Sequence, residues 1–125
     1  MKDLPKPPAE AMIFEDDKLY VCLASFPLTR GHSVVVWKKK VKDLNLLDRE
    51  DYEHLMDVVE LARKAIMKTL MVEKVYLLYL DETKHVHWHL VPRYKEQGIT
   101  VLNHDAEELK NFHLAGKIKK NWKPK

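Results

Sequence analysis

Three histidines at every second position of one short segment constrain the fold of this chain more than any other feature. His85, His87 and His89 alternate with apolar residues. In a β-strand successive side chains point to opposite faces, so the three imidazoles would line one face while the apolar residues pack on the other. We therefore predict a strand from His85 to Pro92 with one polar and one buried face.

The rest of the chain predicts five strands and two helices in the order β-β-β-α-β-β-α. The strands are the apolar, β-prone runs at 12–14, 19–24, 33–37, 75–80 and 85–92. A first helix is predicted from the N-cap Asp48 to Leu70, because apolar residues recur between them at steps of three and four. A second helix is predicted to begin at Asp105 and to fray into a basic tail from Lys117. Short connections favour an antiparallel β-sheet covered by helices, an α+β fold.

Length and composition limit the domain organisation and the partners. A chain of 125 residues is one domain, with 1–11 a loose, proline-containing lead-in and 12–125 the domain with its basic C-terminal tail. The single Cys22 and the lack of a long apolar run or a signal peptide predict a cytoplasmic protein without a membrane partner. The excess of 22 Lys and Arg over 19 Asp and Glu suits a phosphate ester but is too small to predict nucleic-acid binding.

Metal binding is one chemistry that three histidines could perform. At a strand rise of about 3.3 Å per residue the outer two would stand about 13 Å apart, so all three could not reach one ion without a sharp bend. Among the other histidines only His32 is a candidate companion ligand. We therefore expect no metal and no cofactor. A purely structural role for the row is the other alternative, although histidine is not favoured in strands.

Catalysis on an anionic substrate is the third interpretation of the row. A neutral imidazole attacks phosphorus through Nε2 and forms a labile phosphoryl–imidazole bond, provided that an acceptor holds its Nδ1–H. Neighbouring histidines disfavour full protonation of the cluster, since like charges repel. One neighbour could then protonate the leaving group while another holds the phosphate oxygens.

The segment His85-Val86-His87-Trp88-His89-Leu90-Val91 resembles the signature of the histidine triad (HIT) family, in which three histidines alternate with apolar residues. Residues 13–17 resemble the early strand and turn of that family. Residues 27–36 resemble its Pro-x-x-x-Gly-His segment and the apolar run that follows. The resemblance covers about residues 13–93 and implies a HIT-like fold, a homodimer, and hydrolysis or transfer at the α-phosphate of a nucleotide.

The resemblance also implies roles for individual residues. His87 would be the covalent nucleophile, and His89 would contact the scissile phosphate and the leaving atom. His85 would orient the cluster, with His32 behind it. The third histidine, where one branch of the family has Gln, favours the hydrolase-like branches. Leu23, Ser25 and Thr83 are the residues from which we expect substrate contacts.

Some positions depart from the family pattern. Ala24 stands where many members carry an Asp or Asn that binds the ribose, and Trp37 where a Pro is usual. The loop at 81–84 lacks the glycine-rich stretch and the Gln or Ser that holds the leaving group, for which the Thr83 hydroxyl could substitute. A hydrolase of a nucleotide P–N or P–O bond is the leading hypothesis. A nucleotidylyltransferase or phosphorylase, a dinucleoside polyphosphate hydrolase, and a nucleotide-binding module with little turnover are the alternatives.

Overall fold

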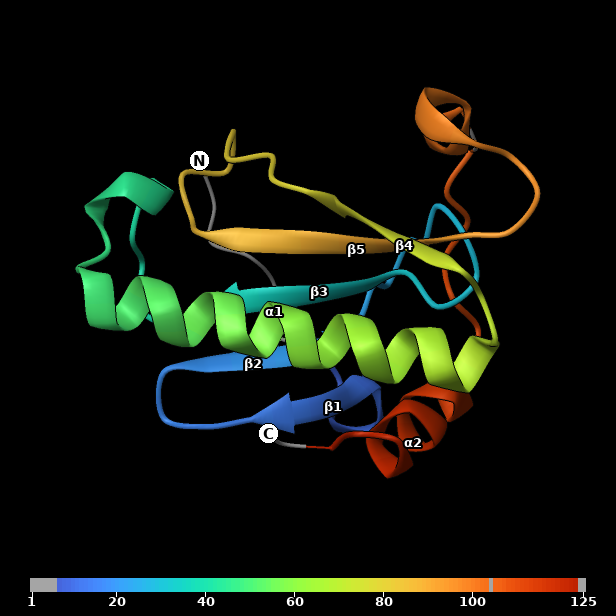
Figure 1. Cartoon of the computed structure of the whole chain (residues 1–125), viewed down its shortest axis with the longest axis horizontal. Coiled ribbons are helices and arrows are strands. Elements are labelled where there is room, and N and C mark those ends of the chain that lie inside the picture. Colours follow the sequence, from blue (N-terminus) through green and yellow to red (C-terminus); the bar gives the residue numbers. More distant parts are fainter. Residues whose placement is uncertain (1–6, 104, 124–125) are drawn as a thin grey trace.

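The computed structural model describes residues 7–103 and 105–123. Five antiparallel strands form one sheet in the order β1-β2-β3-β5-β4, and helix α1 lies across one of its faces (Figure 1). The elements are β1 (Met12–Glu15), β2 (Leu19–Leu23), β3 (Ser33–Trp37), α1 (Arg49–Leu70), β4 (Lys74–Leu78), β5 (His87–Arg93) and α2 (His113–Lys120). Strands and helices thus follow in the predicted order, and the α+β fold with its antiparallel sheet is confirmed.

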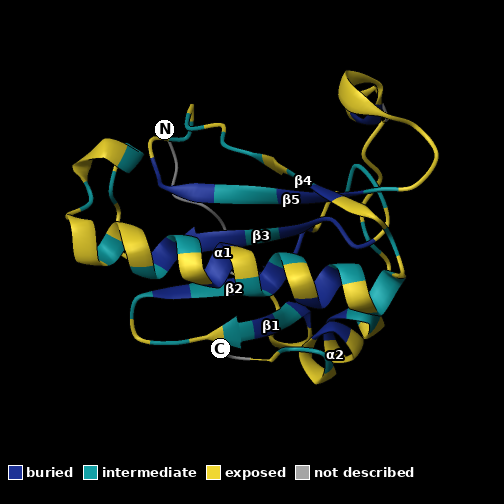
Figure 2. Cartoon of the chain, viewed as in Figure 1, coloured by how far each residue is buried: buried dark blue, intermediate teal, exposed yellow. Residues whose placement is uncertain are grey.

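The hydrophobic core lies between α1 and the sheet face that it covers. Buried and exposed residues alternate along α1, so that one side of the helix packs on the sheet and the other faces solvent (Figure 2). Every second residue of the central strands meets this helix side, as the two-residue period of a strand requires. The core includes Val21, Val35, Leu55, Val59, Ala62, Ile66 and Leu90.

Helix α1 begins and ends at well-formed caps. The Asp48 carboxylate accepts a hydrogen bond from the backbone N–H of Asp51 at 2.8 Å, as predicted for an N-cap. At the other end Met71 adopts a left-handed conformation and its N–H donates to the Met67 carbonyl. Both ends of this helix are therefore fixed by the chain's own residues.

The second helix begins later than predicted. It starts at His113 rather than at Asp105, and it continues past Lys117 to Lys120. Before it, the backbone N–H of Leu109 donates to the Ser25 carbonyl at 2.7 Å, which holds this segment extended along the β2–β3 connection. The helix continues through the basic residues because its apolar face is buried at Ala115 and Ile118.

Short 3-10 turns connect the main elements. The turn Ala9–Ala11 contacts α2 and buries Ala11, so the end of the expected loose lead-in is packed. Residues 1–6 of that lead-in lie outside the described part of the chain. Two more turns, Leu44–Leu46 and Gly98–Leu102, were not predicted. None of the helices in the described part is long and apolar enough to cross a membrane.

Candidate functional site

His87 and His89 of β5 face the side of the sheet that α1 leaves uncovered. His87 pairs with Val36 and His89 with Val34 across the β3–β5 ladder, whereas Val35 belongs to the core under α1. A cleft of about 280 Å³ lies over this face. The cleft is lined by Pro7, Tyr20, Cys22, Leu23, Ala24, Ser25, Phe26, His32, Val34, Val36, His87 and His89.

His85 does not continue the row. The strand begins at His87, and His85 lies in a bend before it and does not line the cleft. Its ring is buried, and Nε2 donates to the Trp37 carbonyl at 2.5 Å. The chain bends here because Val86 exchanges backbone hydrogen bonds with Trp37 and Val41. The predicted strand from His85 is therefore wrong at its start.

The main chain of His85 fixes the tautomer of His87. The Nδ1 atom of His87 lies 2.8 Å from the His85 carbonyl oxygen. A carbonyl only accepts hydrogen bonds, so Nδ1 carries the proton and donates it. In a neutral ring the Nε2 atom of His87 then has a free electron pair, which is the state that a nucleophilic imidazole needs.

A second chain of hydrogen bonds fixes the tautomers of His32 and His89. The backbone N–H of Leu28 donates to Nδ1 of His32 at 3.0 Å, so in a neutral ring the proton of His32 is on Nε2. That Nε2 lies 3.0 Å from Nδ1 of His89 and donates to it. The remaining proton of a neutral His89 is therefore on its Nε2. We call the hydrogen bonds from Leu28 through His32 to His89 the histidine relay.

Burial keeps both rings of the histidine relay neutral. It lowers the pKa of His32 to about 3, and the nearby His89 adds to this effect. Burial also lowers the pKa of His89 to about 4, with a further contribution from the neighbouring His87. The rings of His87 and His89 lie 4.9 Å apart and meet edge to face. The ring of His87, with a free electron pair on Nε2, thus lies beside the ring of His89, which carries an N–H donor on Nε2.

The structure brings some of the predicted substrate-binding residues to the cleft and leaves one outside. Leu23 and Ser25 line the cleft together with Ala24. Thr83 does not line it, and its hydroxyl lies 3.5 Å from the His85 carbonyl, the same oxygen that His87 contacts. In this position Thr83 adjoins the His85 carbonyl that contacts His87, and not the cleft itself.

Sequence reasoning missed several residues of the site. Tyr20 and Cys22 line the cleft because they alternate with the core residues of β2, a pattern visible in the sequence. Burial raises the pKa of both groups to about 12, so the phenol and the thiol stay protonated near neutral pH. Phe26 reaches the cleft with 58% of its surface exposed, and its loop position gave no signal.

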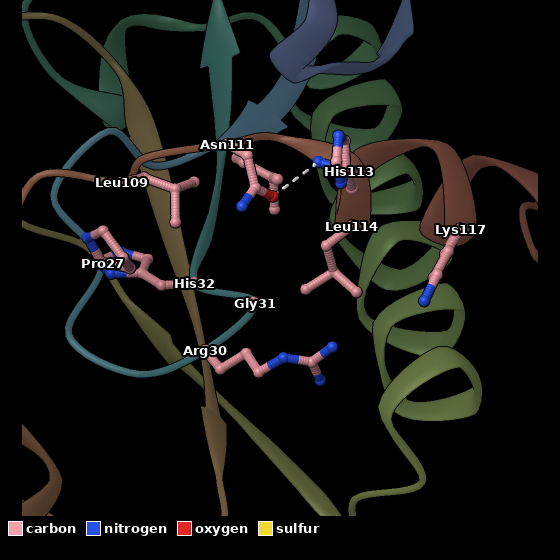
Figure 3. Close-up of a pocket in the computed structure, with 10 residues that line it drawn as sticks. Pro27, Arg30, Gly31, His32, Leu109, Asn111, His113, Leu114 and Lys117 are labelled. Atoms are coloured by element: carbon pink, nitrogen blue, oxygen red, sulfur yellow. Dashed lines mark hydrogen bonds between the residues drawn. The ribbon is translucent and has the colours of Figure 1, made fainter.

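A second, larger cavity adjoins the cleft. Its volume is about 480 Å³, and it lies between the β2–β3 connection and the first turns of α2 (Figure 3). Leu23 and His32 belong to the walls of both the cleft and this cavity. Within residues 7–103 and 105–123 no group of three or more His, Cys, Asp or Glu side chains is placed to hold a metal ion.

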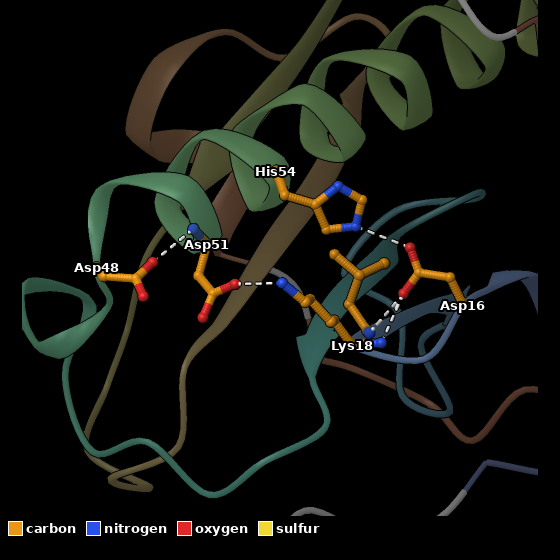
Figure 4. A network of polar contacts seen from close by, with 6 residues as sticks. Asp16, Lys18, Asp48, Asp51 and His54 are labelled. Atoms are coloured by element: carbon orange, nitrogen blue, oxygen red, sulfur yellow. Dashed lines mark hydrogen bonds and ion pairs between the residues drawn. The ribbon is translucent and has the colours of Figure 1, made fainter.

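A polar network at the N-terminal end of α1 is separate from the cleft. Asp16 accepts hydrogen bonds from the backbone of Lys18 and Leu19 and contacts Nε2 of His54 at 2.8 Å, while Lys18 pairs with Asp51 (Figure 4). Burial alone would raise the pKa of Asp16, but these hydrogen bonds outweigh it and lower the pKa. The network fastens the start of α1 to the β1–β2 turn and is structural.

Comparison with known proteins gives a consistent result. A family model described as the HIT domain matches residues 8–96. An uncharacterised HIT-like protein of Borreliella burgdorferi is 26% identical in an alignment of length 117, and the match covers 82% of this chain and 83% of that protein.

Several solved structures share the fold. A hypothetical histidine triad nucleotide-binding protein from Sulfolobus tokodaii has a TM-score of 0.73 at 21% identity, over 89% of this chain and 82% of that one. A Zn-bound histidine triad family protein from Mycobacterium smegmatis has a TM-score of 0.72 at 22% identity, with coverages of 93% and 85%. The diadenosine triphosphate hydrolase of Plasmodium falciparum has a TM-score of 0.68 at 20% identity, over 91% of this chain and 77% of that one.

Proposed function

Because this chain belongs to the HIT domain family, we propose that it hydrolyses a nucleotide P–N or P–O bond at the α-phosphate through a covalent intermediate on His87. One observation carries the proposal: the hydrogen bond from Nδ1 of His87 to the His85 carbonyl, which leaves Nε2 free for attack. Family membership supports nucleotide binding, and the resemblance to a diadenosine triphosphate hydrolase makes phosphoanhydride substrates worth testing.

In the first step, Nε2 of His87 attacks the α-phosphorus and forms a P–N bond. The bond from phosphorus to the leaving group breaks, and the leaving group keeps the electron pair. The ring of His87 becomes cationic, and the His85 carbonyl stabilises its Nδ1–H. His89 donates a hydrogen bond from its Nε2–H to the phosphate or the leaving atom, and the leaving group takes any proton that it needs from solvent.

In the second step, water attacks the same phosphorus and the P–Nε2 bond breaks. The electron pair returns to Nε2 of His87, and the water proton passes to the released phosphate or to solvent. A nucleotidylyltransferase or phosphorylase would differ only in the acceptor that replaces water. The histidine relay keeps the donor on His89 in place through both steps.

The cleft suits a nucleoside beside the reacting phosphate. Its floor consists of side chains from β2 and β3, with Phe26 exposed at the edge. An exposed aromatic ring over an apolar floor favours stacking of a planar base. Leu23 and Ser25 are the proposed substrate contacts, while Ala24 has no side-chain group that could bind a ribose hydroxyl.

The experiment is turnover of a panel of substrates by wild type and His87→Ala. The panel contains nucleoside phosphoramidates, dinucleoside polyphosphates and nucleotide sugars, each with and without a chelator. Removal of a covalent nucleophile should lower turnover by about three orders of magnitude or more while nucleotide binding persists. His54→Ala is the control, because it also removes a histidine but lies outside the cleft. Near-normal turnover by His87→Ala would exclude the mechanism.

The chelator distinguishes this mechanism from metal catalysis. We propose that the reaction uses no metal or other cofactor, so activity should survive exhaustive chelation. Loss of activity that zinc restores would favour a metal site instead. If wild type binds nucleotides but turns over none of the panel, the nucleotide-binding module is the better description.

We also propose that the protein is a homodimer. Strand β4 ends the strand order of the sheet, so one of its edges has no partner strand within the described chain. Leu77 and Leu80 are exposed on or just beyond this strand, and Tyr52 is exposed on the nearby α1. An open strand edge flanked by apolar side chains is a surface that a second copy could cover.

A further inference from the structure

The cavity beside the cleft has an unusual set of polar groups. Arg30 extends into it from the β2–β3 connection, and Lys117 approaches from α2 on the opposite side (Figure 3). Asn111 and His113 stand at the entry to α2. None of the described residues that line the cavity is acidic, so two permanent positive charges face the same space.

These polar groups are mainly hydrogen-bond donors, and the Arg30 side chain also contacts the Tyr94 hydroxyl. The Asn111 side-chain oxygen already accepts from the backbone N–H of His113 at 3.3 Å, which leaves its amide NH₂ as a donor. Arg30 and Lys117 can only donate. Neither of these two residues forms an ion pair with a carboxylate in the described part of the chain. A cavity with this lining complements an anion with several acceptor oxygens.

The segment that carries Arg30 is held in place. The Tyr94 hydroxyl donates to the Arg30 carbonyl at 2.6 Å, and the Thr29 hydroxyl donates to the Pro92 carbonyl at 2.8 Å. Gly31, next along, has a φ of +89°, and a Cβ there would collide with the Leu70 side chain. The backbone of this segment is therefore anchored to the sheet and α1 before any ligand arrives, which lowers the entropic cost of binding.

The cavity is also adjacent to the proposed chemistry. His32 forms part of its wall, and the same ring donates to His89 across 3.0 Å. Leu23 is the other residue shared with the cleft. A group bound in the cavity would therefore be one imidazole ring away from the ring that contacts the scissile phosphate.

We propose that this cavity is a second anion site, which binds a phosphate group through Arg30, Lys117 and the amide of Asn111. The phosphate belongs either to the distal part of a polyphosphate substrate or to a separate phosphate ligand. Both sources offer the same oxygens to the same donors. Only binding of a polyphosphate substrate rests on the proposed function, because a separate phosphate ligand could bind whether or not the protein is a hydrolase.

The binding test uses His87→Ala protein, which removes turnover, and inorganic tripolyphosphate as the probe. Calorimetry should show binding that weakens by about fivefold when either Arg30→Gln or Lys117→Gln is added, because each removes one charged donor. Lys119→Gln is the matched control, since it removes the same charge from the same helix but does not line the cavity. Amide NMR signals of Asn111 and Leu114 should shift on binding.

The site is excluded if tripolyphosphate does not bind, or if Arg30→Gln and Lys117→Gln bind it as tightly as Lys119→Gln. Shifts confined to signals of the cleft would overturn it as well. These outcomes do not depend on whether the protein is a hydrolase, because the tested protein lacks its nucleophile.

Kinetics in the otherwise wild-type protein then identify the source of the phosphate. If Arg30→Gln raises KM for a dinucleoside triphosphate about fivefold and leaves KM for a nucleoside phosphoramidate unchanged, the phosphate is part of the substrate. If binding of tripolyphosphate depends on Arg30 but neither KM changes, the phosphate is a separate ligand.

Discussion

Acid should destabilise this protein through His32. The ring is only 5% exposed, and burial together with the neighbouring His89 lowers its pKa from 6.5 to about 3. The unfolded chain takes up a proton on this residue near pH 6.5, whereas the folded chain does so only near pH 3. Stability rises with pH wherever the unfolded state binds more protons. The contribution of His32 is therefore complete above about pH 6.5 and is lost progressively as the pH falls toward its folded-state pKa.

The size of the effect follows from the two pKa values. At pH 5 the solution lies about 1.5 pH units below the unfolded-state pKa and still well above the folded-state pKa. Each unit corresponds to about 1.4 kcal/mol, so His32 alone should lower the free energy of unfolding by about 2 kcal/mol between pH 7.5 and pH 5.

The assay compares urea unfolding of wild type and His32→Asn at pH 7.5 and pH 5. Asn offers an oxygen to the Leu28 N–H but cannot take up a proton in this range, so the variant should lose about 2 kcal/mol less than wild type on acidification. Equal losses in the two proteins would refute the reasoning. Nitrogen NMR of wild type at pH 5 is a second check, because a doubly protonated His32 would contradict the buried neutral ring.

Three further outcomes are expected. Ala24→Asp should raise the preference for ribo- over deoxyribonucleotide substrates by up to about tenfold in kcat/KM, since it restores a ribose acceptor; strong ribose selectivity in wild type would show that another group already makes this contact. Light scattering should give about twice the chain mass of 14.8 kDa, and Leu77→Lys on the open edge of β4 should return the protein to a monomer; a monomeric wild type would exclude the dimer. Asp48→Ala should lower the free energy of unfolding by about 1 kcal/mol through loss of the α1 cap, with Asp57→Ala on an exposed turn of the same helix as the control; equal effects would contradict the cap.

The parts of the structure that follow from short-range patterns were predictable. Alternation placed His87 and His89 on one strand face, and the spacing of apolar residues together with Asp48 gave the start of α1. The same alternation applied to β2 would have placed Tyr20 and Cys22 in the cleft. Such patterns suffice because each residue's direction is set by its immediate neighbours along the chain.

Other parts depend on contacts between distant segments and could not be read from the chain. His85 leaves the row because Trp37 and Val41, far away in sequence, hold the backbone on either side of Val86. Helix α2 starts later than the predicted Asp105 because the backbone of Leu109 is hydrogen-bonded to Ser25 of the β2–β3 connection.

The anchor of the histidine relay has a consequence for how mutations are tolerated. The donor that orients His32 is the main-chain N–H at position 28, and the Leu28 side chain takes no part in that hydrogen bond. Every amino acid except proline supplies the same N–H. Position 28 can therefore vary widely in evolution or in a saturation library without disturbing the orientation of the site, and only proline would break it. Residue identity at this position thus says little about how much the site depends on it.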